Sequence, residues 1–149
     1  MRPAGRPRTL LYGGMLTAGR QRNLVLILAR ELAENLATPT FIADDEGRLV
    51  YYNEAAEAIL GRSFAEAGEL PAEEWAPHFA IEELDGTPLV LEELPAGIAL
   101  LERRPAHREI ALTGLDGVRR TLSVTAIPLY ARASEFVGLV AIFWELGPS

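Results

Sequence analysis

The chain has 149 residues, of which 49% are apolar and 23% charged, proportions typical of a globular protein with one domain. It contains no cysteine, which excludes disulfides, thiolate catalysis and zinc–thiolate or iron–sulfur sites. Arginine supplies all 14 basic residues, so a lysine Schiff base and a phosphate-loop lysine are also excluded. The net charge is −7, and an acidic body argues against a nucleic-acid-binding face.

The first 19 residues are rich in Gly, Pro and Arg and have no hydrophobic periodicity, so we predict a flexible basic tail with Met1 or Met15 as the natural start. Such a tail is interpreted as solvated in preference to an arm for a membrane surface or a nucleic acid. The apolar run 24–29 is far shorter than the ~20 residues of a membrane-spanning helix. We therefore expect a cytoplasmic protein without a membrane span.

Apolar residues at three- and four-residue spacing predict an amphipathic helix over residues 20–37. The helix is expected to end before Thr38-Pro39, because the residue ahead of a proline is pushed out of the helical region. Its apolar stripe is a candidate dimerisation surface, formed by Leu24, Val25, Leu28, Leu32 and Leu36.

Two short β-branched and aromatic runs, PTFIAD (39–44) and RLVYYN (48–53), predict a hairpin of two strands. Asn53 is suited to cap a helix that follows directly, with acidic residues in its first turn. Gly61 supplies the left-handed position that commonly ends a helix. The stretch therefore predicts a strand that passes into a short helix through one asparagine.

The rest of the chain predicts several short helices followed by three strands. Short turns of helix are expected at 64–68 and 71–75, and a longer helix over 92–103. The strands are REIALTGL (108–115), VRRTLSVTAIPLY (118–130) and EFVGLVAIFWEL (135–146), with an Asp-Gly turn between the first two. Because βαβ alternation is missing, this order indicates an α+β domain on an antiparallel sheet.

The last strand is apolar at both odd and even positions, from Val137 to Trp144. A strand with one wet face would alternate between apolar and polar residues, so this strand is predicted to lie centrally and to be covered on both faces. The short helices of 54–103 can cover one face. The amphipathic helix, a partner subunit or both would cover the other.

These elements together resemble a PAS domain, a member of a family of sensory modules, over residues 38–146. The resemblance rests on FIADDEGRLVYYNEAAEAILG, LDGTP, LPAGIALLERRP, LDGVRRTLSVTAIPLY and FVGLVAIFWE, which occur in the family's order. It implies a five-stranded antiparallel sheet in the order 2-1-5-4-3, with short helices on one face and a flanking N-terminal helix. It also implies a small ligand between sheet and helices, or a signal relayed through a dimer of the flanking helix.

The resemblance leaves the cofactor unknown. Flavin-based and chromophore-tethering light sensors of this family need a cysteine, which the chain lacks. Haem-binding relatives use a histidine on the helix matching 92–103, and EELPAGIALLER has none. We interpret His78 and His107 as ordinary hydrogen-bonded or exposed histidines. We find no catalytic constellation and no metal-ligand spacing in the sequence.

The candidate ligand pocket follows from strand parity. If Leu122 and Val124 share a face with the even-numbered residues of the last strand, that face meets apolar residues of the short helices. Tyr52, Asn53 and Thr125 are the polar anchors, although Asn53 fits a cap better than a contact. These residues form either a filled core or a ligand cavity, and the full candidate set is Tyr52, Asn53, Ile59, Phe64, Trp75, Phe79, Ile98, Leu101, Leu122, Val124, Val140, Ile142 and Trp144.

The sequence thus favours a non-enzymatic sensory or dimerisation module that forms a homodimer and acts on a separate output partner, with a small apolar ligand as a possible signal. A protein-interaction domain with a filled core is the main alternative. A small-molecule carrier or isomerase-like enzyme is a further one, and it would need a buried, pKa-shifted carboxylate in the cavity. None of the candidate pocket residues is a carboxylate.

Overall fold

The computed structural model describes residues 24–147, and the predicted tail together with residues 20–23 of the predicted helix lies outside them. The described chain begins with an N-terminal helix over residues 24–34. Five strands follow: β1 (Thr40–Asp44), β2 (Leu49–Tyr52), β3 (Ala106–Thr113), β4 (Arg119–Arg132) and β5 (Glu135–Glu145). No helix within residues 24–147 is long and apolar enough to cross a lipid bilayer.

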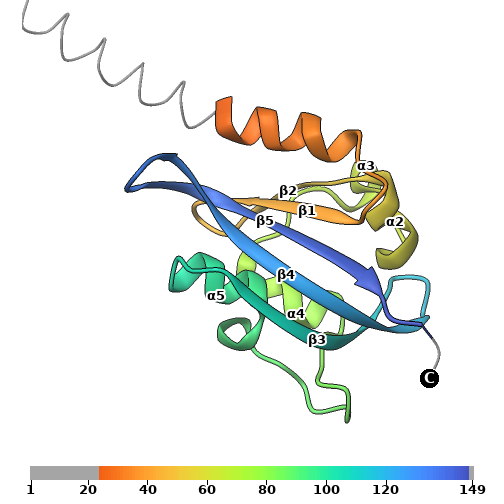
Figure 1. Ribbon diagram of the computed structural model, residues 1–149. Helices are drawn as coiled ribbons and strands as arrows, with labels where there is room; N and C mark the ends of the chain where they lie inside the picture. The colour runs from red at the N-terminus through yellow and green to blue at the C-terminus, as the bar shows by residue number, and fades with distance from the viewer. Residues whose placement is uncertain (1–23, 148–149) are drawn as a thin grey trace, which may run out of the picture.

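The five strands form one antiparallel sheet in the order β2-β1-β5-β4-β3 (Figure 1). This confirms the predicted fold class and strand order. The tight turns are where the sequence places them: Gly47 and Gly117 have φ values of 82° and 81°, which suit glycine in short connections.

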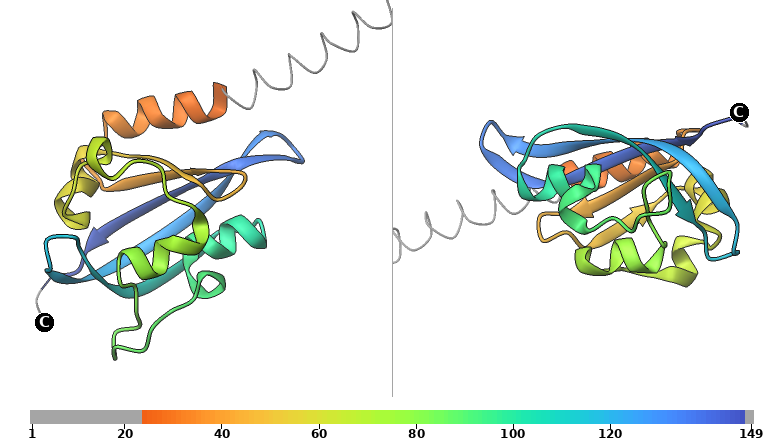
Figure 2. Two further views of the ribbon diagram at one scale, coloured as in Figure 1. Left: turned by 180° about the vertical axis from the view of Figure 1, so that it is seen from behind. Right: turned by 90° about the horizontal axis from the view of Figure 1, so that it is seen from below.

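Between the two strand groups lie the short helices α2 (Glu54–Leu60), α3 (Phe64–Ala67) and α4 (Trp75–His78), then α5 (Pro95–Leu101). Two 3₁₀ turns, η1 (Ala72–Glu74) and η2 (Leu91–Glu93), precede α4 and α5. Seen from behind, α4 and α5 lie in front of the sheet (Figure 2). We call the face that they cover the inner face and the opposite one the outer face.

The junction at Asn53 forms as predicted. The Asn53 side chain accepts a hydrogen bond from the backbone N–H of Ala56, and the α2 helix ends at Gly61 with φ 83°. Gly61 donates its backbone N–H to the Glu57 carbonyl, which satisfies a carbonyl at the helix end.

The helix predicted over 92–103 is shorter than expected. It begins at Pro95, because a proline suits the first helical position, where its missing N–H costs nothing. Residues 91–93 form a separate 3₁₀ turn, and Leu94, with φ −78° and ψ 144°, breaks the helical path between the two. The α5 helix ends at Leu101, whose side chain is 53% exposed.

The central position of β5 is confirmed, since β1 pairs with one side of it and β4 with the other. On its inner face Leu139, Ala141 and Phe143 are buried. On its outer face cover is incomplete: Ile142 is only partly buried, and Trp144 is 45% exposed. The N-terminal helix therefore covers only part of the outer face of this strand.

Candidate functional site

A small cavity of about 60 Å³ lies between the inner face of the sheet and the short helices. Strands β1, β3, β4 and β5 supply one wall, and α2, α4, α5 and the connections around them supply the other. Its lining residues are Phe41, Leu60, Trp75, Phe79, Ile81, Leu94, Pro95, Ala96, Ile110, Leu112, Leu122, Val124, Ala141 and Phe143.

The cavity is apolar throughout. None of its lining residues carries an ionisable side chain. The indole N–H of Trp75 donates to the Leu70 carbonyl at 3.3 Å, and the Trp75 ring meets Phe41 edge-on at 5.3 Å between centroids. A space of this kind has no group that could act as a general acid, a general base or a metal ligand.

The predicted pocket residues are divided among several places. Four of them line the cavity: Trp75, Phe79, Leu122 and Val124. Tyr52, Ile59 and Phe64 pack in the same apolar core without reaching it. Ile98 is partly buried outside the cavity, and Leu101 is largely exposed because α5 ends there.

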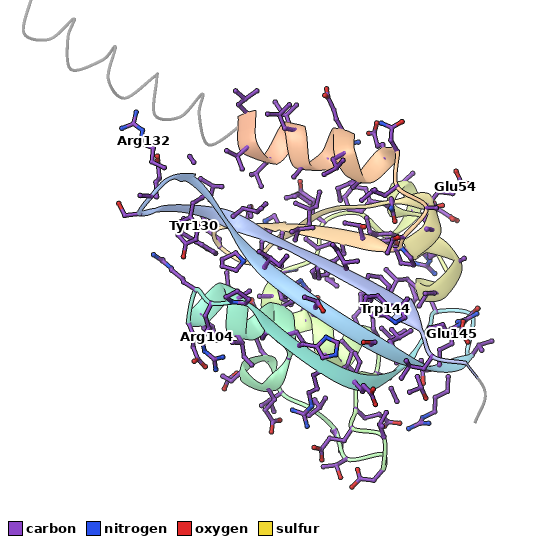
Figure 3. The ribbon with its side chains drawn as sticks, in the orientation of Figure 1. Glu54, Arg104, Tyr130, Arg132, Trp144 and Glu145 are labelled. Carbon is purple, nitrogen blue, oxygen red and sulfur yellow. The ribbon has the colours of Figure 1, made fainter. Side chains whose placement is uncertain are left out.

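The predicted placement of Val140, Ile142 and Trp144 on the inner face is wrong. Val124 lies opposite Phe143 in the β4–β5 ladder, and Thr125 lies opposite Ile142. Directly paired residues point to the same side of a sheet, so the odd-numbered residues of β5 face the cavity and the even-numbered ones face outward. Trp144 accordingly lies on the outer face, near the end of β5 (Figure 3).

None of the predicted polar anchors lines the cavity. The Tyr52 hydroxyl donates to the Arg62 carbonyl at 2.7 Å, and burial, reinforced by the Glu57 carboxylate, raises the pKa of Tyr52 to about 12. Thr125 points outward, where its hydroxyl lies 2.8 Å from Nδ1 of His107. The Asn53 side chain is engaged entirely by backbone groups.

The two histidines have ordinary surroundings. His107 is exposed on β3, with Ser123 Oγ 3.3 Å from its Nε2 and Thr125 on its other nitrogen. His78 is exposed at the end of α4, and its ring meets Phe79 edge-on. Within residues 24–147 no three His, Asp or Glu side chains are grouped so that they could hold a metal ion.

A second and larger space lies on the outer face. It is a groove of about 310 Å³ between the N-terminal helix and the sheet. Its lining is apolar except for one threonine, and comprises Val25, Leu28, Ala29, Leu32, Ala33, Leu36, Thr40, Leu129, Val140 and Ile142. Four of the five predicted dimerisation residues line it, whereas Leu24 does not.

The N-terminal helix contacts β2 through a cation–π interaction. The Arg30 guanidinium lies over the Tyr51 ring, 4.6 Å from its centroid, and also pairs with Glu34 at 3.3 Å. The helix nevertheless exposes a row of large apolar side chains. Leu24, Ile27, Leu28 and Leu32 are 52 to 64% exposed.

The family is decided by sequence. The profile of the family described as PAS fold matches residues 33–148. The chain belongs to the PAS family. No curated protein matches the chain significantly.

Solved structures with the same fold include PAS and LOV domains. The PAS domain of a Colwellia psychrerythraea protein has a TM-score of 0.58 at 16% identity and covers 82% of this chain and 97% of its own. The LOV domain of the Erythrobacter litoralis EL346 blue-light activated histidine kinase has a TM-score of 0.59 at 21% identity. The match covers 76% of this chain and 100% of the LOV domain. The light-state dimer of the fungal photoreceptor Vivid has a TM-score of 0.55 at 17% identity. The match covers 74% of this chain and 79% of the Vivid chain. At these identities the likeness concerns the fold.

Sequence reasoning missed most of the cavity lining of this PAS domain. The omitted residues include Ala141 and Phe143, because the odd-numbered residues of β5 were assigned to the outer face. They also include Phe41, which pairs with Ala141 across β1 and β5, and Ile110 and Leu112 of β3. Residues 110–112 of β3 are all buried and follow exposed polar residues at 107 and 109. This change from polar to apolar residues was a signal present in the sequence.

Proposed function

We propose that this PAS domain is a non-enzymatic module that relays a signal through a homodimer built on its N-terminal helix and the outer face of its sheet. The observation that carries the proposal is the pairing of an apolar groove of about 310 Å³ with a row of exposed leucines on the adjoining helix. Contiguous apolar surface of this kind marks a site of association.

The surface is suited to a second copy of the same chain. In a two-fold dimer each subunit presents the same patch, so the leucine row of one helix enters the groove of the other and its own groove is filled in return. The side chains that carry this contact are Leu28 and Leu32, which are 53% and 64% exposed and also line the groove. Vivid, which shares the fold, forms a dimer in its light state.

The small inner cavity favours a signal passed through protein–protein contacts over a signal sensed by a bound cofactor. Its volume of about 60 Å³ is less than half of the ~150 Å³ that holds benzene and far below the ~300 Å³ of small ligand pockets. The apolar lining favours the filled-core alternative, with room for an apolar molecule of only a few atoms. The lack of any carboxylate in the lining argues against the isomerase-like alternative.

We expect a partner to supply the output, because the described residues comprise the PAS domain and its N-terminal helix. The EL346 relative is a domain of a histidine kinase, which is an example of an output joined to this fold. Here a change in the relative position of two N-terminal helices would be the signal that such a partner receives.

Native mass spectrometry of the purified chain tests the proposal. The expected spectrum contains a homodimer without adduct, and added flavin or haem leaves its mass unchanged. A chain that stays monomeric at all concentrations would contradict the dimer. A stoichiometric adduct with the mass of a cofactor would contradict the filled core. It would make the inner cavity the leading candidate for the sensing site.

A further inference from the structure

Asn53 contacts two helices at once. Its Oδ1 accepts hydrogen bonds from the backbone N–H groups of Thr40 and Ala56, both at 3.0 Å. Its Nδ2 donates to the carbonyls of Ala33 and Thr38 at 2.9 Å, with Leu36 O at 3.4 Å. The side chain is 1% exposed, so these backbone groups take the place of water around it.

These contacts lie at opposite helix ends. Ala33 and Leu36 belong to the last turn of the N-terminal helix and the residues just after it, where carbonyls lack partners within the helix. Ala56 lies in the first turn of α2, where N–H groups lack acceptors. One amide therefore caps the end of the first helix with its N–H groups and the start of the second with its oxygen.

We infer that Asn53 is a positioning residue: it fixes the N-terminal helix against the core, in addition to capping α2. The other polar contacts of that helix are exposed, as with Arg30 on Tyr51. Among the contacts of the described chain, the Asn53 amide provides the buried polar link between the helix and the sheet. Asn53 is also connected to the inner cavity, because the α2 helix that it caps carries Leu60, one of the lining residues.

The inference rests on the proposed function for its consequence, since the position of the helix sets the shape of the groove in which a second copy would bind. Asparagine suits this position because it combines an acceptor with two donors on a short side chain. Aspartate keeps the acceptor and loses the donors. Serine keeps a cap for α2, but its shorter side chain cannot reach the Ala33 carbonyl.

The experiment measures helix position directly. The chain has no cysteine, so Glu31→Cys on the helix and Glu109→Cys on β3, both at exposed positions, give a pair of unique spin-label sites. The labelled protein is diluted with unlabelled protein, so that distances within one chain are recorded. The variants are Asn53→Ser and Asn53→Asp, and circular dichroism checks that each is folded.

The matched control is Ser63→Ala. Ser63 caps the N-terminus of α3 by accepting from Glu66 N–H at 3.3 Å, and its side-chain hydrogen bonds are with Glu66 rather than with the N-terminal helix. Removing the Ser63 hydroxyl tests whether the loss of any helix cap disturbs the position of the N-terminal helix. Hydrogen exchange at Ala56 reports whether α2 keeps its cap in the Asn53 variants.

The expected result is one narrow distance distribution for the wild type and for Ser63→Ala. Both Asn53 variants should give a broadened or shifted distribution, while the Ala56 amide keeps its protection to within about tenfold. Folded Asn53 variants with the wild-type distribution would overturn the inference, even if the protein is a dimer. A changed distribution in a protein that never dimerises would leave the inference standing and contradict the proposed function.

Discussion

Leu26 of the N-terminal helix packs over Gly138 of β5. A Cβ atom at Gly138 would come 3.2 Å from Cδ2 of Leu26 and 2.3 Å from the carbonyl oxygen of Ala43 on β1. The glycine therefore permits a close approach of both the helix and the neighbouring strand at the centre of the sheet. This contact places the helix on the outer face near the start of β5, where Gly138 pairs with Asp44 of β1.

Gly138→Ala is expected to lower the free energy of unfolding by about 1–3 kcal/mol, because the added methyl group must displace the backbone of β1. Urea denaturation measures the effect. Gly147→Ala is the control, since a Cβ atom there meets nothing within 4 Å, and it should leave stability unchanged. Equal stability of Gly138→Ala and the wild type would show that β1 and the helix do not pack as described.

Val124→Ile tests whether the inner cavity has room for one more methylene group. The added methylene should enter the cavity and raise the free energy of unfolding by up to about 0.8 kcal/mol. Val118→Ile adds the same group at an exposed position and should have little effect. A clear loss of stability in Val124→Ile alone would mean that the space is already filled.

Tyr52 makes the free energy of unfolding depend on pH in the alkaline range. Its pKa lies near 10 in an unfolded chain and is raised to about 12 in the fold by burial and by Glu57. Folding thus favours the neutral phenol: its contribution is complete below about pH 10 and is lost as the pH rises toward about 12.

Tyr52→Phe cannot titrate, so its stability should lack this alkaline loss. Near pH 9 the variant should be less stable than the wild type by roughly 1–3 kcal/mol, because the Arg62 carbonyl loses its donor. The gap should narrow as the pH rises above about 10. A difference in unfolding free energy that stays constant across this range would contradict the raised pKa.

Some of these features follow from local sequence. The central place of β5 follows from its two apolar faces, and the Asn53 cap follows from the change of strand into helix at that residue. Such predictions succeed because each depends on the pattern within one segment.

Other features depend on contacts between segments. A strand that is apolar on both sides does not indicate which side meets the cavity, and the parity was set by the register of β4 against β5. That ladder has irregularities around Leu129 and Tyr130, which the sequence did not indicate. The donation from Asn53 to Ala33, 20 residues earlier, likewise arises only when the helix packs on the core.

Sedimentation of surface variants over a dilution series tests the dimer most directly. Leu28→Glu and Leu32→Glu should each weaken self-association at least about 100-fold, roughly 2.8 kcal/mol, because a carboxylate would be buried without a partner. Leu84→Glu replaces a leucine of similar exposure, 49%, in the loop between α4 and α5 and should sediment like the wild-type dimer. Unchanged sedimentation of both helix variants would contradict the account.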